Sequence, residues 1–141
     1  MERARFDEYI RRFNERDPTA FDDFITPDME MLNGALRFTG VAGMRDHYEN
    51  KIWPFFEERL NVIRFVSSDT VLAVQLWTEF IAFDKADTLF GPVEKGERFD
   101  YRGLIMYDVN FEGRFTSITV SYNSFTNTKL SGEVIEMGMP H

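Results

Sequence analysis

Five tyrosines are the side chains of this sequence whose spacing most suggests chemistry: Tyr9, Tyr48, Tyr101, Tyr107 and Tyr122. By helical spacing or strand alternation, each can point into one shared cavity. A buried phenol needs a hydrogen-bond partner, and a cluster of phenols can polarise a carbonyl or hold an enol. For any one tyrosine, an ordinary place in an aromatic core explains the residue equally well. The convergence of all five favours a site.

Two charged residues are further candidates. Arg37 is the only basic residue in the segment 29–39, and at a cavity mouth its guanidinium would orient a carbonyl or stabilise an oxyanion. Its alternative role is a surface ion pair with Glu30 across a hairpin, which would contribute little to stability. Glu133 would supply a general base if the C-terminal tail folded over the cavity. Otherwise it belongs to a solvated tail.

Other kinds of catalytic site are not expected. His47 adjoins Tyr48 but would lie about 100° away around a helix, which favours a surface position. His141 is in the tail, and no His–carboxylate spacing suits a metal, so we predict no metal site. The absence of cysteine excludes disulfides and thiolate chemistry. No phosphate-binding glycine loop or nucleophile elbow is present, so we predict no cofactor.

The composition bounds the class of protein. A chain of 141 residues is most simply one domain, residues 1–141, and its fifteen phenylalanines indicate an aromatic core or pocket. A net charge of −8 without a basic patch argues against nucleic acid and anionic membranes as partners. No apolar run approaches the roughly 18 residues of a membrane span, and no signal peptide is evident. We therefore expect a cytoplasmic protein.

Three helical patterns precede the strands. The first covers residues 3–14, and the second begins at Asp17-Pro18, where an N-cap residue precedes a proline suited to the first helical position. The third starts after Gly40 and should kink or end at Pro54. Apolar residues at helical spacing mark the inward faces: Phe6, Tyr9, Ile10 and Phe13 on the first, and Met44, Tyr48 and Ile52 on the third.

The second half of the chain reads as strands. A hairpin turn at Asn33-Gly34 would pair Glu30 with Arg37. Alternating patterns then predict strands over residues 60–66, 69–83, 98–109 and 114–125, with a loop over 85–96. Helices lying on one curved, mixed sheet give an α+β fold, a cone-shaped barrel that encloses a pocket. Its substrate-binding wall is predicted to comprise Tyr48, Tyr101, Tyr122, Phe13, Leu76 and Ile118.

One strand, residues 69–83, carries apolar side chains on both faces. Its outer face holds Val71, Ala73, Trp77 and Ile81, and the neighbouring strand adds Leu104 and Met106. A bare apolar patch of this kind is uncommon on a soluble monomer, which predicts a homodimer formed through the outer face. Glu79, Asp100 and Arg102 should lie on the same outer face.

Three segments resemble the nuclear-transport-factor-2-like superfamily, which includes ketosteroid isomerases, scytalone dehydratase and SnoaL-like cyclases. They are YIRRFNERDPTAFDDFITPDMEM, FTGVAGMRDHYENKIWP and GERFDYRGLIMYDVNFEGRFTSITVSYNSF, and the resemblance spans about residues 3–126. It implies that Tyr9 donates to a developing oxyanion and that Tyr48 supports it. The acids of those enzymes are missing, since Met31, Ile105 and Val120 stand where carboxylates would be expected.

Two functions from different classes follow. The first is a cofactor-independent isomerase, cyclase or dehydratase acting on an apolar polycyclic intermediate of secondary metabolism, with Arg37 and Tyr9 or Tyr107 stabilising negative charge and Glu133 as base. The second is a non-catalytic ligand-binding or dimeric adaptor domain of the same fold. Polar groups left without partners inside an open cone would favour the first. The substrate and the type of reaction are left open.

Overall fold

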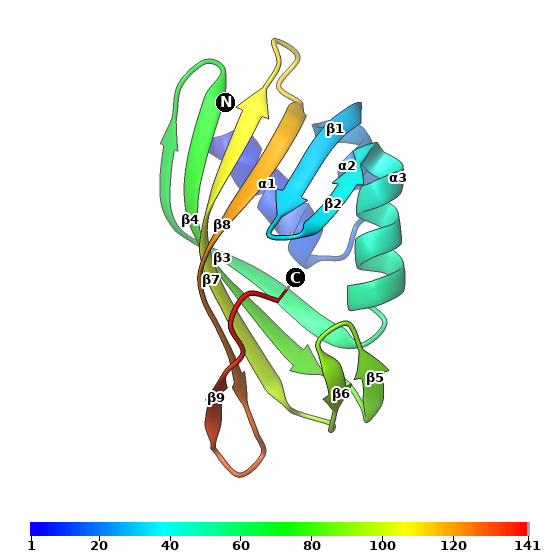
Figure 1. The fold of residues 1–141 in the computed structure, drawn as a ribbon. Coiled ribbons are helices and arrows are strands. Elements are labelled where there is room, and N and C mark those ends of the chain that lie inside the picture. Colours follow the sequence, from blue (N-terminus) through cyan, green and yellow to red (C-terminus); the bar gives the residue numbers. More distant parts are fainter. Residues whose placement is uncertain (141) are drawn as a thin grey trace.

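The computed structural model of the protein describes residues 1–140. Three helical segments lie together beside the sheet: α1 (Arg3–Asn14), α2 (Thr19–Phe24) and α3 (Gly40–Arg45), the last continuing into the π-helical segment η1 (Asp46–Ile52) (Figure 1). The inward face of α1 is buried as predicted, since Phe6, Tyr9, Ile10 and Phe13 are all in the core. The three predicted helices are therefore confirmed.

A mixed sheet forms the rest of the fold. Its order is β2-β1-β8-β7-β4-β3, with β9 also paired to β8, and only β1 and β8 run parallel among the pairs within residues 1–140. The strands are β1 (Ile25–Asn33), β2 (Leu36–Thr39), β3 (Phe56–Ser67), β4 (Val71–Ala82), β5 (Ala86–Thr88), β6 (Gly91–Val93), β7 (Arg98–Val109), β8 (Phe115–Thr128) and β9 (Val134–Glu136). The α+β fold with a curved sheet is confirmed, but β2 and β3 remain open edges, so the sheet does not close into a barrel.

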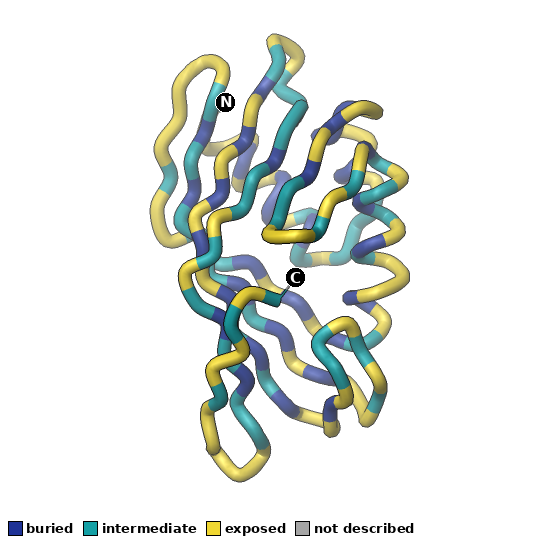
Figure 2. Tube along the Cα trace, in the orientation of Figure 1, coloured by how far each residue is buried: buried dark blue, intermediate teal, exposed yellow. Residues whose placement is uncertain are grey.

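The predicted faces of the two long central strands are confirmed. Alternate residues of β4 are buried, including Leu72, Val74, Leu76 and Phe80, and β7 shows the same alternation (Figure 2). A period of two places such residues on one face of a strand. The opposite face carries Trp77, which pairs with Arg102 across β4 and β7.

The predicted hairpin turn lies one residue too early, so the predicted strand pairing is wrong by two residues. Arg37 pairs with Leu32, and Glu30 pairs with Thr39, so the expected Glu30–Arg37 pair is not formed. Asn33 is the last paired residue of β1, and the two turn residues are Gly34 and Ala35. Gly34 has φ 62°, the conformation that a type II′ turn requires at its first central position.

Three segments contain more strand than the sequence pattern predicts. β3 begins at Phe56, four residues before the predicted start, and the expected loop 85–96 contains the short hairpin of β5 and β6. The tail also pairs with the sheet through β9, after which the Met137 amide donates to the Phe125 carbonyl at 2.8 Å. This last bond directs residues 138–140 back across the sheet.

The outer face of β4 and β7 is partly apolar, with Leu104 50% and Met106 47% exposed. The homodimer expected through this face stays a prediction, and light scattering would test it. Across residues 1–140, no helix has the length and apolar character needed to cross a membrane.

Candidate active site

A cavity of about 90 Å³ lies between the inner face of the sheet and the helical segments. Its walls come from α1, η1 and strands β1, β3, β4, β7 and β8, together with Phe90 of the β5–β6 hairpin. Seven of the predicted site residues line it: Tyr9, Phe13, Tyr48, Leu76, Tyr101, Tyr107 and Ile118. The fold thus brings together residues from both halves of the chain.

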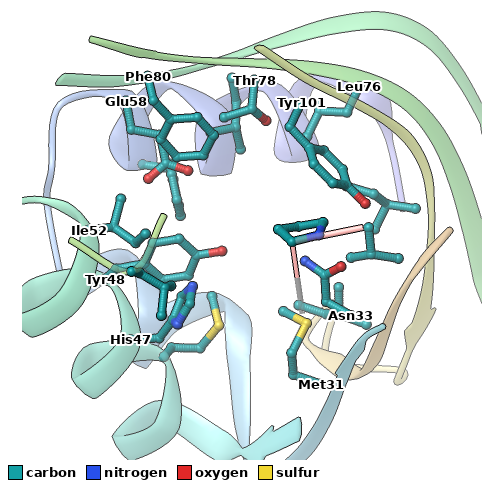
Figure 3. A pocket seen from close by; sticks show the side chains of 18 of the residues that line it. Met31, Asn33, His47, Tyr48, Ile52, Glu58, Leu76, Thr78, Phe80 and Tyr101 are labelled. Atoms are coloured by element: carbon teal, nitrogen blue, oxygen red, sulfur yellow. The ribbon is translucent and has the colours of Figure 1, made fainter. Parts of the chain in front are cut away.

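Glu58 is the carboxyl group inside this cavity. It lies on β3 between Phe56 and Leu60, which are also buried, and its side chain faces the interior (Figure 3). Only 5% of Glu58 is exposed, and its Oε2 atom has no hydrogen-bond partner among residues 1–140. A buried carboxyl without full hydrogen bonding is costly to maintain, which is typical of a functional group.

Burial raises the pKa of Glu58 to about 8, because the charged form loses its hydration. Trp53 and the positive charge of Arg16 act in the opposite direction and favour the carboxylate. The indole Nε1 of Trp53 lies close enough to have this influence, yet it does not reach hydrogen-bond geometry with any described residue. Glu58 can therefore change protonation state near neutral pH, as a general acid or base must.

Arg16 is held close to this carboxyl by the end of α1. Its φ of 58° is left-handed, and two bonds close the helix in a Schellman arrangement: Arg16 N–H to Phe13 O at 2.9 Å and Asp17 N–H to Arg12 O at 3.0 Å. The guanidinium donates to the Phe56 carbonyl at 3.1 Å, at the start of β3. Arg16 therefore lies near Glu58 without lining the cavity.

Tyr9, Tyr48 and Tyr107, from α1, η1 and β7, form a phenol cluster in the cavity. Burial raises the pKa of each, and the charge of Glu58 also raises those of Tyr9 and Tyr48. All three hydroxyls consequently remain protonated and can act as hydrogen-bond donors. Donors fixed in an apolar cavity stabilise negative charge more strongly than donors in water do.

His47 lies in the cavity wall and not on the surface, contrary to the sequence-based expectation. It is buried, its ring stacks on Phe38 with centroids 5.4 Å apart, and it meets Tyr48 edge to face at 4.8 Å. The expectation assumed regular α-helical spacing. The segment is π-helical, with Trp53 N–H bonded to Tyr48 O at 2.8 Å, and such segments occur often at functional sites.

Three predicted residues do not line the cavity. Arg37 is exposed and borders a separate surface hollow with Glu30 and Phe38. Its partner Leu32 lies on the face of β1 opposite to the cavity-lining Met31 and Asn33. Glu133 is exposed in the turn before β9. Tyr122 packs edge to face on Tyr101 with centroids 6.1 Å apart, behind the wall that Tyr101 forms. The carboxyl group expected in the cavity from Glu133 comes instead from Glu58.

The sequence did contain a signal for Glu58. Phe56, Glu58 and Leu60 alternate, and all three are buried on the inner face of β3. The strand was predicted to begin only at Leu60, after a helix expected to kink or end at Pro54. Extending the period of two back to Phe56 would have placed one glutamate inside the cone.

The C-terminal tail contributes to the cavity through Pro140. Figure 1 shows this end of the chain between the β1–β2 and β5–β6 hairpins. Even a cavity of roughly 150 Å³ accommodates only a ligand of about benzene size. A polycyclic ligand thus requires the tail to move away from the mouth.

Metal coordination finds no support here: within the part of the chain that is described, no group of three His, Asp or Glu side chains is arranged to hold a metal ion. Met31, Ile105 and Val120, which stand where the resembling enzymes were expected to carry acids, all line the cavity. Among the described residues that line the cavity, Glu58 supplies the carboxyl group.

A family model for the SnoaL-like domain matches residues 6–118. No curated protein sequence matches the chain. Among solved structures, a Δ5-3-ketosteroid isomerase from a Mycobacterium species is similar at 18% identity, with a TM-score of 0.70 and coverage of 89% of this chain and 96% of that one. At these levels of identity, such likeness shows a shared fold.

Two further solved structures have comparable folds. A SnoaL-like polyketide cyclase from Agrobacterium tumefaciens is 20% identical, with a TM-score of 0.66 over 84% of this chain and 87% of that one. The epoxide hydrolase/cyclase-like enzyme SalBIII, described in pyran ring formation in the polyether salinomycin, is 18% identical, with a TM-score of 0.66 and the same two coverages.

Proposed function

The chain belongs to the SnoaL-like domain family, and on that premise we propose that it is a small cofactor-independent isomerase or cyclase acting on an apolar polycyclic natural-product intermediate. Glu58 is the observation that carries the proposal. It is a buried carboxyl in an aromatic cavity, with a pKa of about 8 and one oxygen lacking a partner within residues 1–140. A group with these properties suits proton transfer near neutral pH.

The proposed step begins with Glu58 as carboxylate. It removes a proton from the carbon next to a ligand carbonyl, and the C–H electron pair moves to the carbonyl oxygen, giving an enolate. Phenol hydroxyls of Tyr9, Tyr48 and Tyr107 donate to this oxygen. Where a carbon–carbon double bond adjoins the enolate, the proton returns from Glu58 to the far carbon of that bond as the carbonyl re-forms, which is isomerisation. Where the ligand has a second carbonyl, the enolate carbon bonds to its carbon, and the displaced C=O electron pair takes the proton from Glu58 to give a hydroxyl, which is cyclisation.

The names of two similar proteins support the proposal. One is a ketosteroid isomerase and the other a polyketide cyclase, and both share the fold. The aromatic wall of the cavity provides the apolar surroundings that such ligands need. The competing function, a non-catalytic binding domain, would use the same cavity without proton transfer at Glu58.

Deuterium exchange tests the proposal without knowledge of the natural substrate. The ring ketone trans-2-decalone is incubated with the protein in D₂O, and mass spectrometry follows deuterium uptake next to its carbonyl. We expect the protein to accelerate this uptake over buffer alone. In Glu58→Gln the acceleration should fall by ~10²–10⁴-fold, the usual contribution of a positioned general base.

Glu79→Gln is the matched control, because Glu79 lies on the opposite face of the same sheet and bonds Arg98 at 2.6 Å. Its exchange rate should stay close to that of the wild type. Equal rates for wild type and Glu58→Gln, with both proteins folded, would favour the binding-domain function.

A further inference from the structure

A second polar group faces the cavity away from Glu58. Tyr101 is 9% exposed, and its hydroxyl oxygen has no hydrogen-bond partner in the described part of the chain. Burial and the neighbouring Tyr122 raise the pKa of Tyr101 to about 12, so the hydroxyl remains a donor. An unpaired buried hydroxyl destabilises the free protein unless a ligand completes its bonding.

The fold holds the Tyr101 ring in this orientation. Gly103 lies two residues further along β7, beside a register shift, and a Cβ there would come within 3.0 Å of Tyr101 Cε1 and 2.7 Å of the Ser121 carbonyl oxygen. Only glycine leaves the ring this space. Phe125 and Tyr122 contact the ring at centroid distances of 5.9 Å and 6.1 Å. The position of the hydroxyl is therefore built into the sheet.

Asn33 provides a second polar group on the same side. It ends β1 and lines the cavity, and its amide makes no side-chain hydrogen bond within residues 1–140. Figure 3 shows Tyr101 and Asn33 on one side of the cavity, while Glu58, Tyr48 and His47 lie on the other. The charge of Glu58 acts on Tyr48 but is not among the causes that shift Tyr101. The cavity thus has two separate polar ends.

We propose that the Tyr101 hydroxyl and the Asn33 amide form a second polar subsite, which binds a ligand oxygen across the cavity from Glu58. The inference rests on the proposed function, because that function places the reacting carbonyl of the ligand at Glu58. It defines a substrate class: an apolar ring system with an enolisable carbonyl at one end and a second hydrogen-bond acceptor, such as a carbonyl or ether oxygen, at the other. Leu76 and Phe80 contact the ring system between these ends.

Two ketones that differ by one carbonyl test the subsite. trans-Decalin-2,6-dione carries a carbonyl at each end, whereas trans-2-decalone has the same rings and only one. Titration calorimetry compares their dissociation constants. The wild type should bind the dione roughly three- to tenfold more tightly, the contribution of one net hydrogen bond. In Tyr101→Phe this ratio should fall, with the affinity for the monoketone unchanged.

Tyr122→Phe is the matched control, because it removes the same atom from the adjoining ring outside the cavity. It should keep the preference for the dione. Tyr101→Phe should also unfold at a higher temperature than the wild type, since it removes an unpaired buried hydroxyl. A purely structural hydroxyl would show the reverse, a lower unfolding temperature.

The subsite is overturned if the wild type binds both ketones equally, if it binds neither at millimolar concentration, or if Tyr101→Phe keeps the preference. Deuterium exchange in trans-2-decalone separates failure of the subsite from failure of the proposed function. Exchange that depends on Glu58 without a preference for the dione removes only the subsite. A preference for the dione without exchange supports the subsite and removes the catalytic function.

Discussion

Carboxyl groups on the two faces of the sheet have pKa values shifted in opposite directions. On the inner face, Glu58 has an oxygen without a partner within the described chain, and its pKa is about 8. On the outer face, burial pushes the pKa of Asp100 upward, yet Arg98 and Trp77 together lower it. Arg98 lies 2.9 Å from Asp100 and 2.6 Å from Glu79, and the Trp77 indole donates to Asp100 at 2.8 Å.

The difference teaches that burial alone does not assign a role to a carboxyl group. Both faces remove acids from water, but only the outer face supplies hydrogen-bond donors that fix the charged form. The outer group is therefore a structural network. The inner carboxyl keeps its proton near neutral pH and can release it, which is the property that catalysis needs.

The largest expected effect concerns stability against pH. The pKa of Glu58 is about 8 in the folded protein and 4.5 as a reference for the unfolded chain, so between these values only the folded state holds the proton. Stability should fall as pH rises through this window, by about 1.4 kcal/mol per pH unit and on the order of 5 kcal/mol in all. Urea unfolding at several pH values, with Glu58→Gln as reference, measures it. If the free energies of unfolding of the two proteins differed by the same amount at every pH, the raised pKa of Glu58 would be contradicted.

The outer network should give a smaller effect. Arg98→Ala removes the cation from Asp100 and Glu79, and we expect a loss of about 1–2 kcal/mol at pH 7, reduced from the value for a fully buried pair because water reaches the site. Urea unfolding measures the loss. Arg102→Ala, which removes a cation 4.5 Å from the Trp77 ring, should cost less. The rate of deuterium exchange in trans-2-decalone should be unchanged in both variants. A large loss of this rate would show that the two faces of the sheet are coupled.

Arg16→Gly should bring a still smaller change, confined to the inner face. Arg16 lowers the pKa of Glu58 through its charge, so its removal should move the pH midpoint of deuterium exchange upward. Glycine is the residue best suited to φ 58°, which keeps the helix end intact. Arg16→Lys serves as the control that keeps a positive charge, and its midpoint should stay near that of the wild type. Identical midpoints in all three proteins would exclude an influence of Arg16.

The smallest effect should follow removal of residues 138–141. Pro140 lines the cavity, so a shortened tail should admit water and lower the pKa of Glu58. The pKa shift of the inner carboxyl group would then differ less from that of the outer ones. The pH midpoint of deuterium exchange should shift downward. A protein truncated only at His141 provides the comparison. An unchanged midpoint in the longer truncation would mean that the tail does not shield Glu58.

Much of the scaffold followed from periodicity. The inward face of α1, the alternation along β4 and the outward position of Glu79, Asp100 and Arg102 were all predicted, because spacing fixes which side of an element a residue faces. The predicted cavity wall of Tyr9, Phe13, Tyr48, Leu76, Tyr101, Tyr107 and Ile118 is based on the same rule, and these residues do line the cavity.

The misplaced residues have separate causes. Arg37 pairs with Leu32, on the face of the hairpin opposite to Met31 and Asn33, which line the cavity. Tyr122 pairs with Gly103 beside a register shift and packs on Tyr101 without lining the cavity. His47 lies in the cavity wall on a π-helical segment. Strand alternation accounts for Arg37, whereas the π-helical turn at His47 is local geometry that periodicity does not describe.

The sequence by itself therefore determined the class of fold, the order of its elements and the aromatic character of the cavity, because these depend on the periods of apolar residues along the chain. Only the tertiary structure decided which acid lies inside. Glu57, Glu58 and Glu133 are chemically equivalent in the sequence, and the pKa of a carboxyl depends on the neighbours that folding brings to it. For Glu58 those neighbours include Arg16, which follows α1, and Tyr9 of α1, both far from Glu58 along the chain.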